Sequence, residues 1–452
     1  MARTGADSSA DTGSIVVAIL LLSALPAVLS NVGLRAALWG AAAFVVLGTA
    51  SVFGSARAQG RVLEFEFVAR RPHYLQAVLQ AIIYAYWGYH FRLVYDQIPL
   101  IAAQLAFAYA FDMLLAWSHR DRYTLGFGQF PIIFSINLFL WFKPDWFYLQ
   151  FLMIAVGFAA KELIRWEKDG RRVHVFNPSS FPLGLFSLGL LLTGSTGITW
   201  GQEIANTFEL PPYIRPWIFL IGLPGQYLFG VTTMTMSAVV TVVLFNLGYV
   251  GIFGTYFFID AYVPAAVFLG MHLLFTDPST SPRTEAGRIL FGCLYGLSTV
   301  ALYQVLGALG LPMFYDKLLQ VPVLNLTVRG IDRMVNRWGP AKLLPQLAGP
   351  ARNAAYMGVW AVVFAMMSAA QGVGDQHPGQ WLPFWRQACA DQRAYACSYY
   401  ADMTLTACRQ GSSWACNETG LMHLRLARSG EDARRENESG AREPFEIGRA
   451  HV

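Results

Sequence analysis

The chain has 452 residues, of which 55% are hydrophobic and only 13% are charged, and its formal net charge at pH 7 is +5. Because about a quarter of the residues in a typical soluble domain are charged, this composition excludes an ordinary soluble protein. The small positive charge is expected from the basic loops of a membrane protein and does not indicate nucleic-acid binding.

Long uncharged windows recur along the chain, and a membrane-spanning helix needs about 20 apolar residues. We therefore expect an all-α polytopic membrane protein with about 10–12 transmembrane helices. The first apolar run could instead be a cleaved signal peptide, although it has no convincing A-x-A site and a second span follows at once. Candidate spans lie near residues 14–30, 33–54, 74–94, 97–118, 125–142, 146–164, 178–193, 287–310 and 352–370, with at least two more within 216–275.

Basic residues cluster in the loops after the second, fourth and sixth candidate spans, around residues 57–71, 119–122 and 161–172. Short basic loops mark the cytoplasmic side of a membrane. A further basic segment at 317–342 precedes the last span, so the C-terminal tail is expected on the opposite side. The expected location is the inner (cytoplasmic) membrane of a bacterium, with the tail in the periplasm.

Two carboxylates lie within apolar stretches, Asp112 in "AYAFDMLLAW" and Asp260 in "YFFIDAYVP". A carboxylate inside a membrane is costly and often marks a cation or proton path. Both residues are therefore candidates for an ion path. The alternative is structural: Asp112 pairs with a neighbouring helix, and Asp260 lies at a membrane interface.

Two similar proline motifs interrupt the membrane part: NPSSFP at 177–182 aligns with DPSTSP at 277–282. Proline removes a backbone donor and restricts the residue before it, and backbone groups freed within lipid must be satisfied by protein or by a polar cavity. Matching breaks in two halves of a chain predict an inverted repeat with a ligand site between the halves. The alternative is that both motifs are ordinary loops with helix N-caps.

Segments around these motifs resemble the NqrB/RnfD family. "FTDPSTSPRTEAGRILFGCLYG" resembles the family signature T-D-P-x-[ST]-x-[PA]…G-R-x-[IL]-F-G, and "VFNPSSFPLG" is similar to its F-N-P-A-x-x-G. "VPVLNLTVRGIDRM" resembles the family segment N-x-[ST]-x-P-x-[IL]-D. The resemblance runs over residues 73–335 and does not include the tail.

The resemblance implies a flavin site. NqrB and RnfD are membrane subunits of ion-pumping NADH:quinone and ferredoxin:NAD oxidoreductases. They have two inverted helix bundles, a flavin on the threonine of S-G-A-T through a phosphoester, and a second flavin. The nearest match here ends at Thr199 in "TGIT", with Ile198 in place of the alanine. RnfD-like membrane proteins of enediyne gene clusters keep both proline motifs without a clear attachment sequence.

FMN or riboflavin is therefore the expected cofactor, and a quinone is a further candidate. The expected cofactor-binding residues are Thr199 and the motif residues Asn177, Ser179, Thr276, Asp277, Ser279 and Thr280.

The tail after residue 375 has four of the five cysteines, in two C-x7-C segments. Short helices ending at Cys389 and Cys408, with others beginning at Cys397 and Cys416, would place each pair across a helix-turn-helix corner. That spacing suits disulfides Cys389–Cys397 and Cys408–Cys416 in an oxidising compartment. The segments resemble Sel1-type repeats. The alternatives are a zinc site, which would prefer closer spacing, and free thiols.

Five regions are expected: N-terminal spans with a cytoplasmic loop (1–72), an NqrB/RnfD-like membrane domain (73–345), a last transmembrane helix (346–375), disulfide-bridged helices (376–428) and a disordered tail (429–452). The expected function is that of an electron-transfer subunit within a larger membrane complex. It would pass electrons through a flavin or quinone, with cation movement coupled to it. The alternatives are an inverted-repeat transporter or channel and a scaffold whose tail recruits an extracytoplasmic protein. No stand-alone catalytic motif is present.

Overall fold

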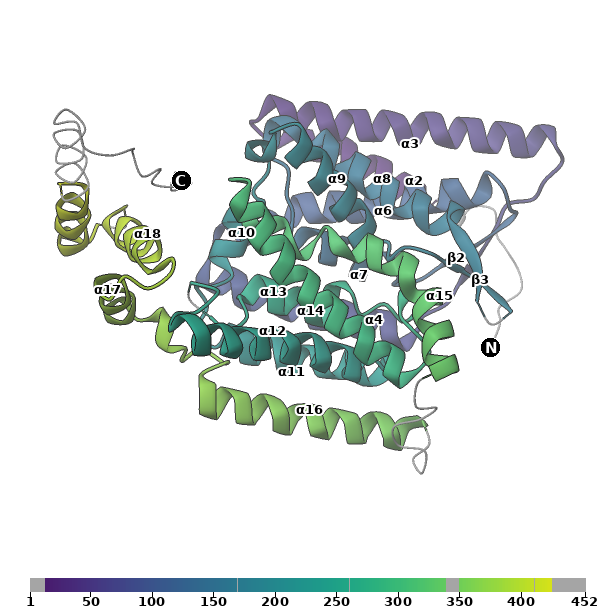
Figure 1. The fold of residues 1–452 in the computed structure, drawn as a ribbon. Helices are drawn as coiled ribbons and strands as arrows, with labels where there is room; N and C mark the ends of the chain where they lie inside the picture. Colours follow the sequence, from purple (N-terminus) through teal and green to yellow (C-terminus); the bar gives the residue numbers. More distant parts are fainter. Residues whose placement is uncertain (1–12, 169, 260, 339–348, 410, 425–452) are drawn as a thin grey trace, which may run out of the picture. The chain divides into compact units, whose positions relative to one another are not determined.

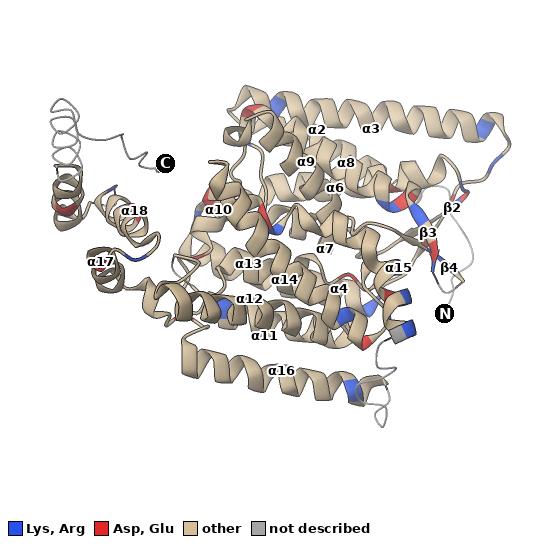
Figure 2. Ribbon diagram, in the orientation of Figure 1, with Lys and Arg blue, Asp and Glu red and all other residues tan. Residues whose placement is uncertain are grey.

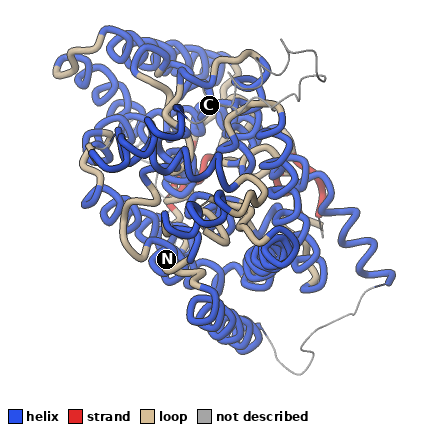
Figure 3. Tube along the Cα trace, turned by 60° about the vertical axis from the view of Figure 1, so that its left-hand side comes forward, coloured by secondary structure: helices blue, strands red, loops and turns tan. Residues whose placement is uncertain are grey.

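The computed structural model describes residues 13–168, 170–259, 261–338, 349–409 and 411–424. These residues are mostly helical, and the strands among them form two short two-stranded sheets (Figure 3). The expected helical class is therefore confirmed. The chain divides into two compact units, residues 1–241 with 265–363 and residues 242–264 with 364–452.

The first unit contains most of the helices, and α12 and α16 continue into the second. The helices are α2 (Gly13–Ala24), α3 (Val32–Ala58), α4 (Arg71–His90), α5 (Leu93–Asp96), α6 (Ile98–Trp117), α7 (Gln129–Asn137), α8 (Tyr148–Leu163), α9 (Ser180–Leu192), α10 (Gly201–Thr207), α11 (Ile214–Phe229), α12 (Thr232–Phe253), α13 (Ala265–Leu269), α14 (Glu285–Ala308), α15 (Gln320–Trp338) and α16 (Gly349–Gln371).

Shorter elements connect these helices. Strand β1 (Glu64–Phe67) pairs in parallel with β2 (Arg122–Leu125), and β3 (Arg165–Lys168) forms an antiparallel hairpin with β4 (Arg171–His174). The short helical turns are η1 (Leu25–Ala27), η2 (Pro144–Trp146), η3 (Thr196–Ile198), the π-helix η4 (Gly270–Leu274), η5 (Pro278–Thr280) and η6 (Met313–Lys317).

Within the described part of the chain, five helical stretches are long and apolar enough to cross a membrane: Val32–Ala58, Leu93–Trp117, Thr232–Phe253, Glu285–Ala308 and Gly349–Gln371. Each of them falls on an expected span. Large apolar side chains remain exposed along these helices, such as Leu47 in α3 and Leu244 in α12. Extended exposed apolar surface is typical of a face that contacts lipid or a partner. The larger number of spans expected from the sequence stays a prediction.

The span expected at 125–142 is not one continuous helix. The chain pairs as β2 up to Leu125, turns through Gly126 and Gly128, and forms only the short helix α7 before an extended segment at Phe142. Glycine favours such turns. Only glycine fits at position 126, because a Cβ there would lie 2.6 Å from the carbonyl oxygen of Val68. The apolar window therefore contains a strand, a turn and a half-length helix.

Buried amide side chains hold the end of α7 in place. Asn137 and Gln104 exchange two hydrogen bonds, of 3.0 and 2.7 Å, and Gln150 donates to the Gln104 side-chain oxygen at 3.3 Å. The Gln150 oxygen in turn accepts from the backbone N–H of Phe142 at 3.1 Å. Because a buried polar group without a partner is costly, this network fixes α7 against α6 and α8.

Helices α3, α6 and α8 of the first unit run alongside one another (Figure 1). Most lysine and arginine residues of this unit gather at the end where β2, β3 and β4 lie (Figure 2). A concentration of basic residues at one end of a helix layer is what the positive-inside rule leads us to expect for the cytoplasmic end.

The second unit contains the cysteine-rich helices, α17 (Leu382–Ala390), α18 (Ala396–Arg409) and a third helix at 413–424, after the turn η7 (Pro378–Gln380). Disulfides Cys389–Cys397 and Cys408–Cys416 are both formed, each with a Cα–Cα distance of 4.5 Å. They join successive helices across their corners, which confirms the predicted pairing. The resemblance to Sel1-type repeats stays a prediction, and the tail expected to be disordered, residues 429–452, lies outside the described residues.

Removing the first disulfide should loosen the corner between α17 and α18. A bridge that closes so short a loop stabilises by about 2–3 kcal/mol. Replacing Cys389 and Cys397 together by serine should therefore increase opening of this corner roughly 30- to 150-fold, measured by hydrogen exchange of α18. The control is Cys293→Ser in α14, since Cys293 is a free thiol. Equal exchange in both variants would contradict the prediction.

Candidate functional site

Both proline motifs are organised by side-chain caps. The Asn177 Oδ1 atom accepts from the backbone N–H groups of Ser179 and Ser180, at 3.0 and 3.1 Å, and from the Ser179 hydroxyl at 2.8 Å. The Asp277 Oδ1 atom accepts the equivalent bond from the N–H of Ser279 at 2.9 Å. A short Asn or Asp side chain readily bonds the backbone two residues onward. The capping interpretation, left open by the sequence, holds for both motifs.

The two motifs also contact each other reciprocally. Asn177 Nδ2 donates to the carbonyl oxygen of Leu274, three residues before Asp277, at 2.9 Å. Asp277 Oδ2 lies 2.7 Å from Nε2 of His174, three residues before Asn177. Asn177 thus contacts the residue three positions before Asp277, and Asp277 contacts the residue three positions before Asn177. The first contact is with a backbone carbonyl and the second with a side chain, and both join the two motifs directly.

Two further elements hold the motifs together. Asn325 in α15 is fully buried, accepts from the backbone N–H of Asn177 at 3.1 Å and donates to the carbonyl oxygen of Thr280 at 3.4 Å. Lys168 at the end of β3 donates to the carbonyl oxygen of Ser281 at 2.7 Å. The β3–β4 hairpin and α15 therefore lock the two loops into one rigid wall.

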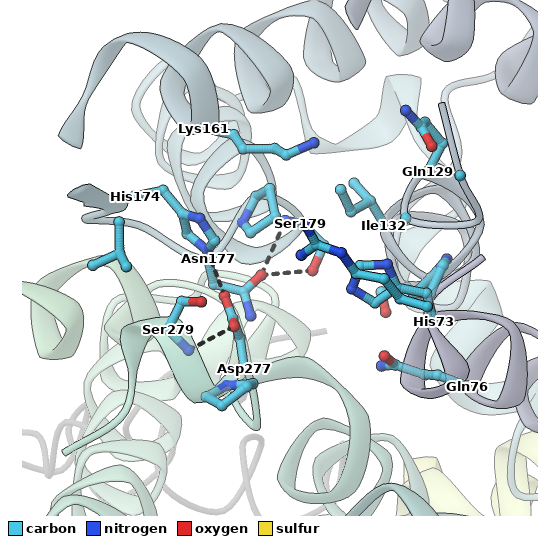
Figure 4. Close-up of a pocket in the computed structure, with 18 of the residues that line it drawn as sticks. His73, Gln76, Gln129, Ile132, Lys161, His174, Asn177, Ser179, Asp277 and Ser279 are labelled. Carbon is cyan, nitrogen blue, oxygen red and sulfur yellow. Dashed lines mark hydrogen bonds and ion pairs between the residues drawn. The ribbon is translucent and has the colours of Figure 1, made fainter. Parts of the chain in front are cut away.

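This wall borders a cavity of about 530 Å³. Motif residues line one side, and His73 and Gln76 of α4 lie opposite, with Lys161 of α8 between them (Figure 4). The remaining walls come from α6, α7, the hairpin and the ends of α11 and η4. The motif residues in the lining are Asn177, Pro178, Ser179, Thr276, Asp277, Pro278 and Ser279.

No protein-family model, curated protein or solved structure matches this chain. We therefore infer the function of the chain from the residues that line this cavity.

The cavity has an excess of positive charge. Its lining contains two carboxylates, Asp112 and Asp277. It also contains five lysine or arginine side chains: Arg70, Arg120, Lys161, Arg165 and Arg172. Lys161 pairs with Asp112 at 3.6 Å, whereas Arg120 and Arg165 both pair with Glu162. Among the described residues, the exposed side chains of Arg70 and Arg172 have no ion-pair or hydrogen-bond partner. They remain available to a ligand.

Two groups in the cavity have shifted pKa values. Burial lowers the pKa of His73, and the positive charges of Arg70 and Lys161 lower it further, against an opposing effect of Asp277. Burial alone would raise the pKa of Asp277, but the charge and hydrogen bond of His174 help to hold that pKa below its ordinary value. At neutral pH the cavity therefore contains a neutral His73 and an ionised Asp277.

Asp112, the first candidate for an ion path, lines the same cavity. It is buried and accepts hydrogen bonds from the Tyr123 hydroxyl at 3.1 Å and from Gln129 Nε2 at 2.9 Å. Its ion pair with Lys161 agrees with the interpretation that Asp112 pairs with a neighbouring helix. Because Asp112 also lines the cavity, a role in an ion path stays a prediction. The second candidate, Asp260, lies outside the described residues.

Thr199 and Thr280 do not line the cavity, unlike the other predicted cofactor residues. The Thr199 side chain is 3% exposed, its hydroxyl donates to the Thr196 carbonyl oxygen at 3.0 Å, and the residue bridges to Phe142. Thr280 is fully buried, and its hydroxyl donates to the carbonyl oxygen of Asp277 at 3.4 Å. A phosphoester needs an accessible hydroxyl, so nothing in this geometry supports attachment at Thr199.

The far side of the cavity is closed by a segment that was not predicted from the sequence, Gly126, Gly128 and Gln129. The signal was present, because a strand-like "RYTL" is followed by Gly-x-Gly and then by an apolar helix. The apolar window around it concealed this pattern. Among the described residues, no cluster of three His, Cys, Asp or Glu side chains could hold a metal ion.

Proposed function

We propose that this chain is a membrane electron-transfer subunit that holds a flavin in the cavity between its two proline motifs. One observation carries the proposal: the segments that resemble NqrB/RnfD, although separated by about a hundred residues of sequence, meet at a single cavity. Ligand sites between matching broken segments are a general feature of inverted-repeat membrane proteins.

The size and lining of the cavity fit such a ligand. A volume of about 530 Å³ lies within the roughly 300–1,000 Å³ typical of small-molecule sites. Ile132, Phe229 and Leu273 provide apolar surface for a planar ring, while Gln76 and Gln129 provide hydrogen-bonding groups for its polar edge. A bound flavin would supply one- and two-electron transfer, and the residues of this chain would orient it and limit its contact with water.

The chain has no dinucleotide-binding fingerprint, so electrons would come from a partner subunit in a larger complex, and a quinone is one candidate acceptor. We place the protein in the inner membrane of a bacterium, with the cavity at the cytoplasmic end and the cysteine-rich tail in the periplasm. The basic end of the first unit, where β2, β3 and β4 lie, supports this orientation (Figure 2).

The absorption spectrum of the purified protein tests the proposal. We expect a flavin spectrum that acid precipitation transfers to the supernatant, because Thr199 is buried away from the cavity. Ile132→Trp should fill the cavity and reduce the bound flavin at least about 10-fold, whereas Leu47→Trp on the exposed face of α3 should not. A colourless protein that also fails to bind added flavin would contradict the proposal.

A transporter is the second candidate, favoured by one observation: Asp112 and Lys161 face the same cavity as an ion pair. A carboxylate that exchanges its partner for a cation is a common device in transport. Movement of a cation or small solute into liposomes by a colourless protein, abolished in Asp112→Asn, would favour this function over electron transfer.

A further inference from the structure

The exposed face of α15 changes from apolar to basic along the helix. Val323 and Leu326 are 62% and 57% exposed. The exposed Arg329 and Arg333 follow within the next two turns. Because Arg333 comes seven residues after Leu326, the two side chains lie on the same face, about 10 Å apart along the helix axis. Gly330 lies between the two arginines, and the space where its Cβ would be is open, with nothing within 4 Å.

Helix α9 extends the apolar part of this surface. It runs antiparallel to α15 and in contact with it. The N–H of Asn177, just before α9, donates to Asn325 at 3.1 Å, and a Cβ at Gly184 would lie 2.8 Å from Pro322 Cγ. Leu188 follows Gly184 by one turn and is 47% exposed. Both helices therefore expose apolar side chains beside their contact, which is typical of a surface that meets lipid or a partner.

The β3–β4 hairpin adds a cation beside Arg329. The Arg329 guanidinium lies 4.8 Å from the centre of the Trp166 ring in β3, and it donates to the carbonyl oxygen of Glu167. Lys168 comes two residues after Trp166 and pairs with Arg171 across the hairpin. Residues two apart in a strand, and residues directly opposite in a ladder, point to the same face. Arg171 therefore lies on the face of the hairpin that Arg329 covers.

This combined surface is positively charged. Arg171 and Arg333 make no ion pair among the described residues. The described carboxylates beside them are those of Glu167 and Asp332, and Asp332 accepts from the backbone N–H of Arg283 at 2.9 Å. The hairpin and the last turns of α15 lie at the end of the first unit where lysine and arginine gather (Figure 2). Such basic surfaces at the cytoplasmic side of membrane helices attract anionic headgroups.

We propose that this surface, formed by α9, α15 and the β3–β4 hairpin, binds one anionic phospholipid. The phosphate accepts from Arg171, Arg329 and Arg333, since a guanidinium has five N–H donors in a geometry that suits phosphate. An acyl chain lies along Val323 and Leu326. A lipid matches both the basic and the apolar part of the surface, whereas an acidic soluble protein matches only the basic part. The site is separate from the proposed flavin site, because none of these side chains lines the cavity.

Native mass spectrometry of the full-length protein tests the proposal. The protein is released from detergent micelles that contain equal amounts of dioleoyl phosphatidylglycerol and dioleoyl phosphatidylcholine, which have the same acyl chains. Phosphatidylglycerol should remain bound at least about 20-fold more often, because each basic group at an anionic headgroup contributes about 5-fold. Arg171→Gln/Arg333→Gln should remove most of this preference. This variant keeps the contacts of Arg329 with the hairpin and should therefore fold like the wild type.

The matched control is Arg57→Gln/Arg92→Gln. Both arginines are exposed and lie on other elements of the first unit, so this variant loses the same charge and should keep the preference for phosphatidylglycerol. An equal preference in the wild type and in Arg171→Gln/Arg333→Gln would overturn the site. An equal loss in the control variant would show attraction by total charge alone and would overturn it as well.

Further arms test the apolar part and the kind of ligand. Leu326→Gln should reduce the bound phosphatidylglycerol several-fold, and unchanged binding would place the lipid elsewhere and overturn the site. Glycerol 3-phosphate, which has no acyl chain, should not displace the lipid at equal concentration. Displacement would reveal an anion site without a lipid, and displacement by polyglutamate would reveal a surface for an acidic protein. Either result overturns the assignment to a phospholipid, and neither bears on flavin binding.

Discussion

Replacing Asn177 by leucine should lower the free energy of unfolding by at least about 3 kcal/mol. The Asn177 side chain satisfies the N–H groups of Ser179 and Ser180 and the carbonyl oxygen of Leu274, all within the buried wall between the motifs. Leucine has a similar size but no polar atoms, so three buried backbone groups would lose their partner, each at a cost of about 1–3 kcal/mol. Denaturation in mixed detergent micelles, followed by tryptophan fluorescence, measures the loss.

The matched control is Asn31→Leu at the start of α3. Asn31 is half-buried; its Oδ1 accepts one cap bond from the N–H of Leu34, and its Nδ2 donates to the Asp145 carboxylate at 3.4 Å. Losing such a cap costs about 1 kcal/mol. Asn177→Asp should be intermediate, since it keeps the accepting oxygen but loses the bond to Leu274. Similar losses for Asn177→Leu and Asn31→Leu would show that the first motif is only a surface cap.

The sequence predicted those parts of the fold that depend on local composition. Long apolar runs without breaks, such as α3 and α14, can only be helices in a membrane, and they lie where expected. The window at 125–142 was wrongly predicted to be one membrane-spanning helix, because average hydropathy does not separate a lipid-facing helix from one buried in protein. Its polar residues Gln129 and Asn137 were the local sign of protein burial, since both bond to neighbouring helices.

The site was predictable in part for the same reason. The caps at Asn177 and Asp277 are local and follow from the motifs. Their second contacts, with Leu274 and His174, depend on how distant segments approach each other, which residue spacing does not determine. Asp112 was recognised from its position within an apolar span, but its partner Lys161 looked like an ordinary residue of a basic loop. The cysteine pairs were fully predictable because helix-turn-helix corners fix their spacing.

Asp277→Asn should lower stability at neutral pH by about 1.5–3 kcal/mol. The variant keeps the cap on the Ser279 N–H, but an amide replaces the carboxylate oxygen that lies 2.7 Å from His174 Nε2. Because the pKa of Asp277 is lower in the folded protein than its ordinary value, the ionised form stabilises the fold. This contribution is fully present above the unfolded-state pKa of about 3.9 and is lost as the pH falls through the folded-state pKa.

The pH dependence makes this prediction specific. The difference in unfolding free energy between the wild type and Asp277→Asn should shrink as the pH falls below about 4. Asp121→Asn is the matched control, because Asp121 pairs with Arg61 at an exposed position, where ion pairs contribute about 0–1 kcal/mol. If Asp277→Asn behaves like Asp121→Asn at every pH, the contact with His174 does not hold the two motifs together. The reciprocal pairing of the motifs, and the cavity that depends on it, would then lack an energetic basis.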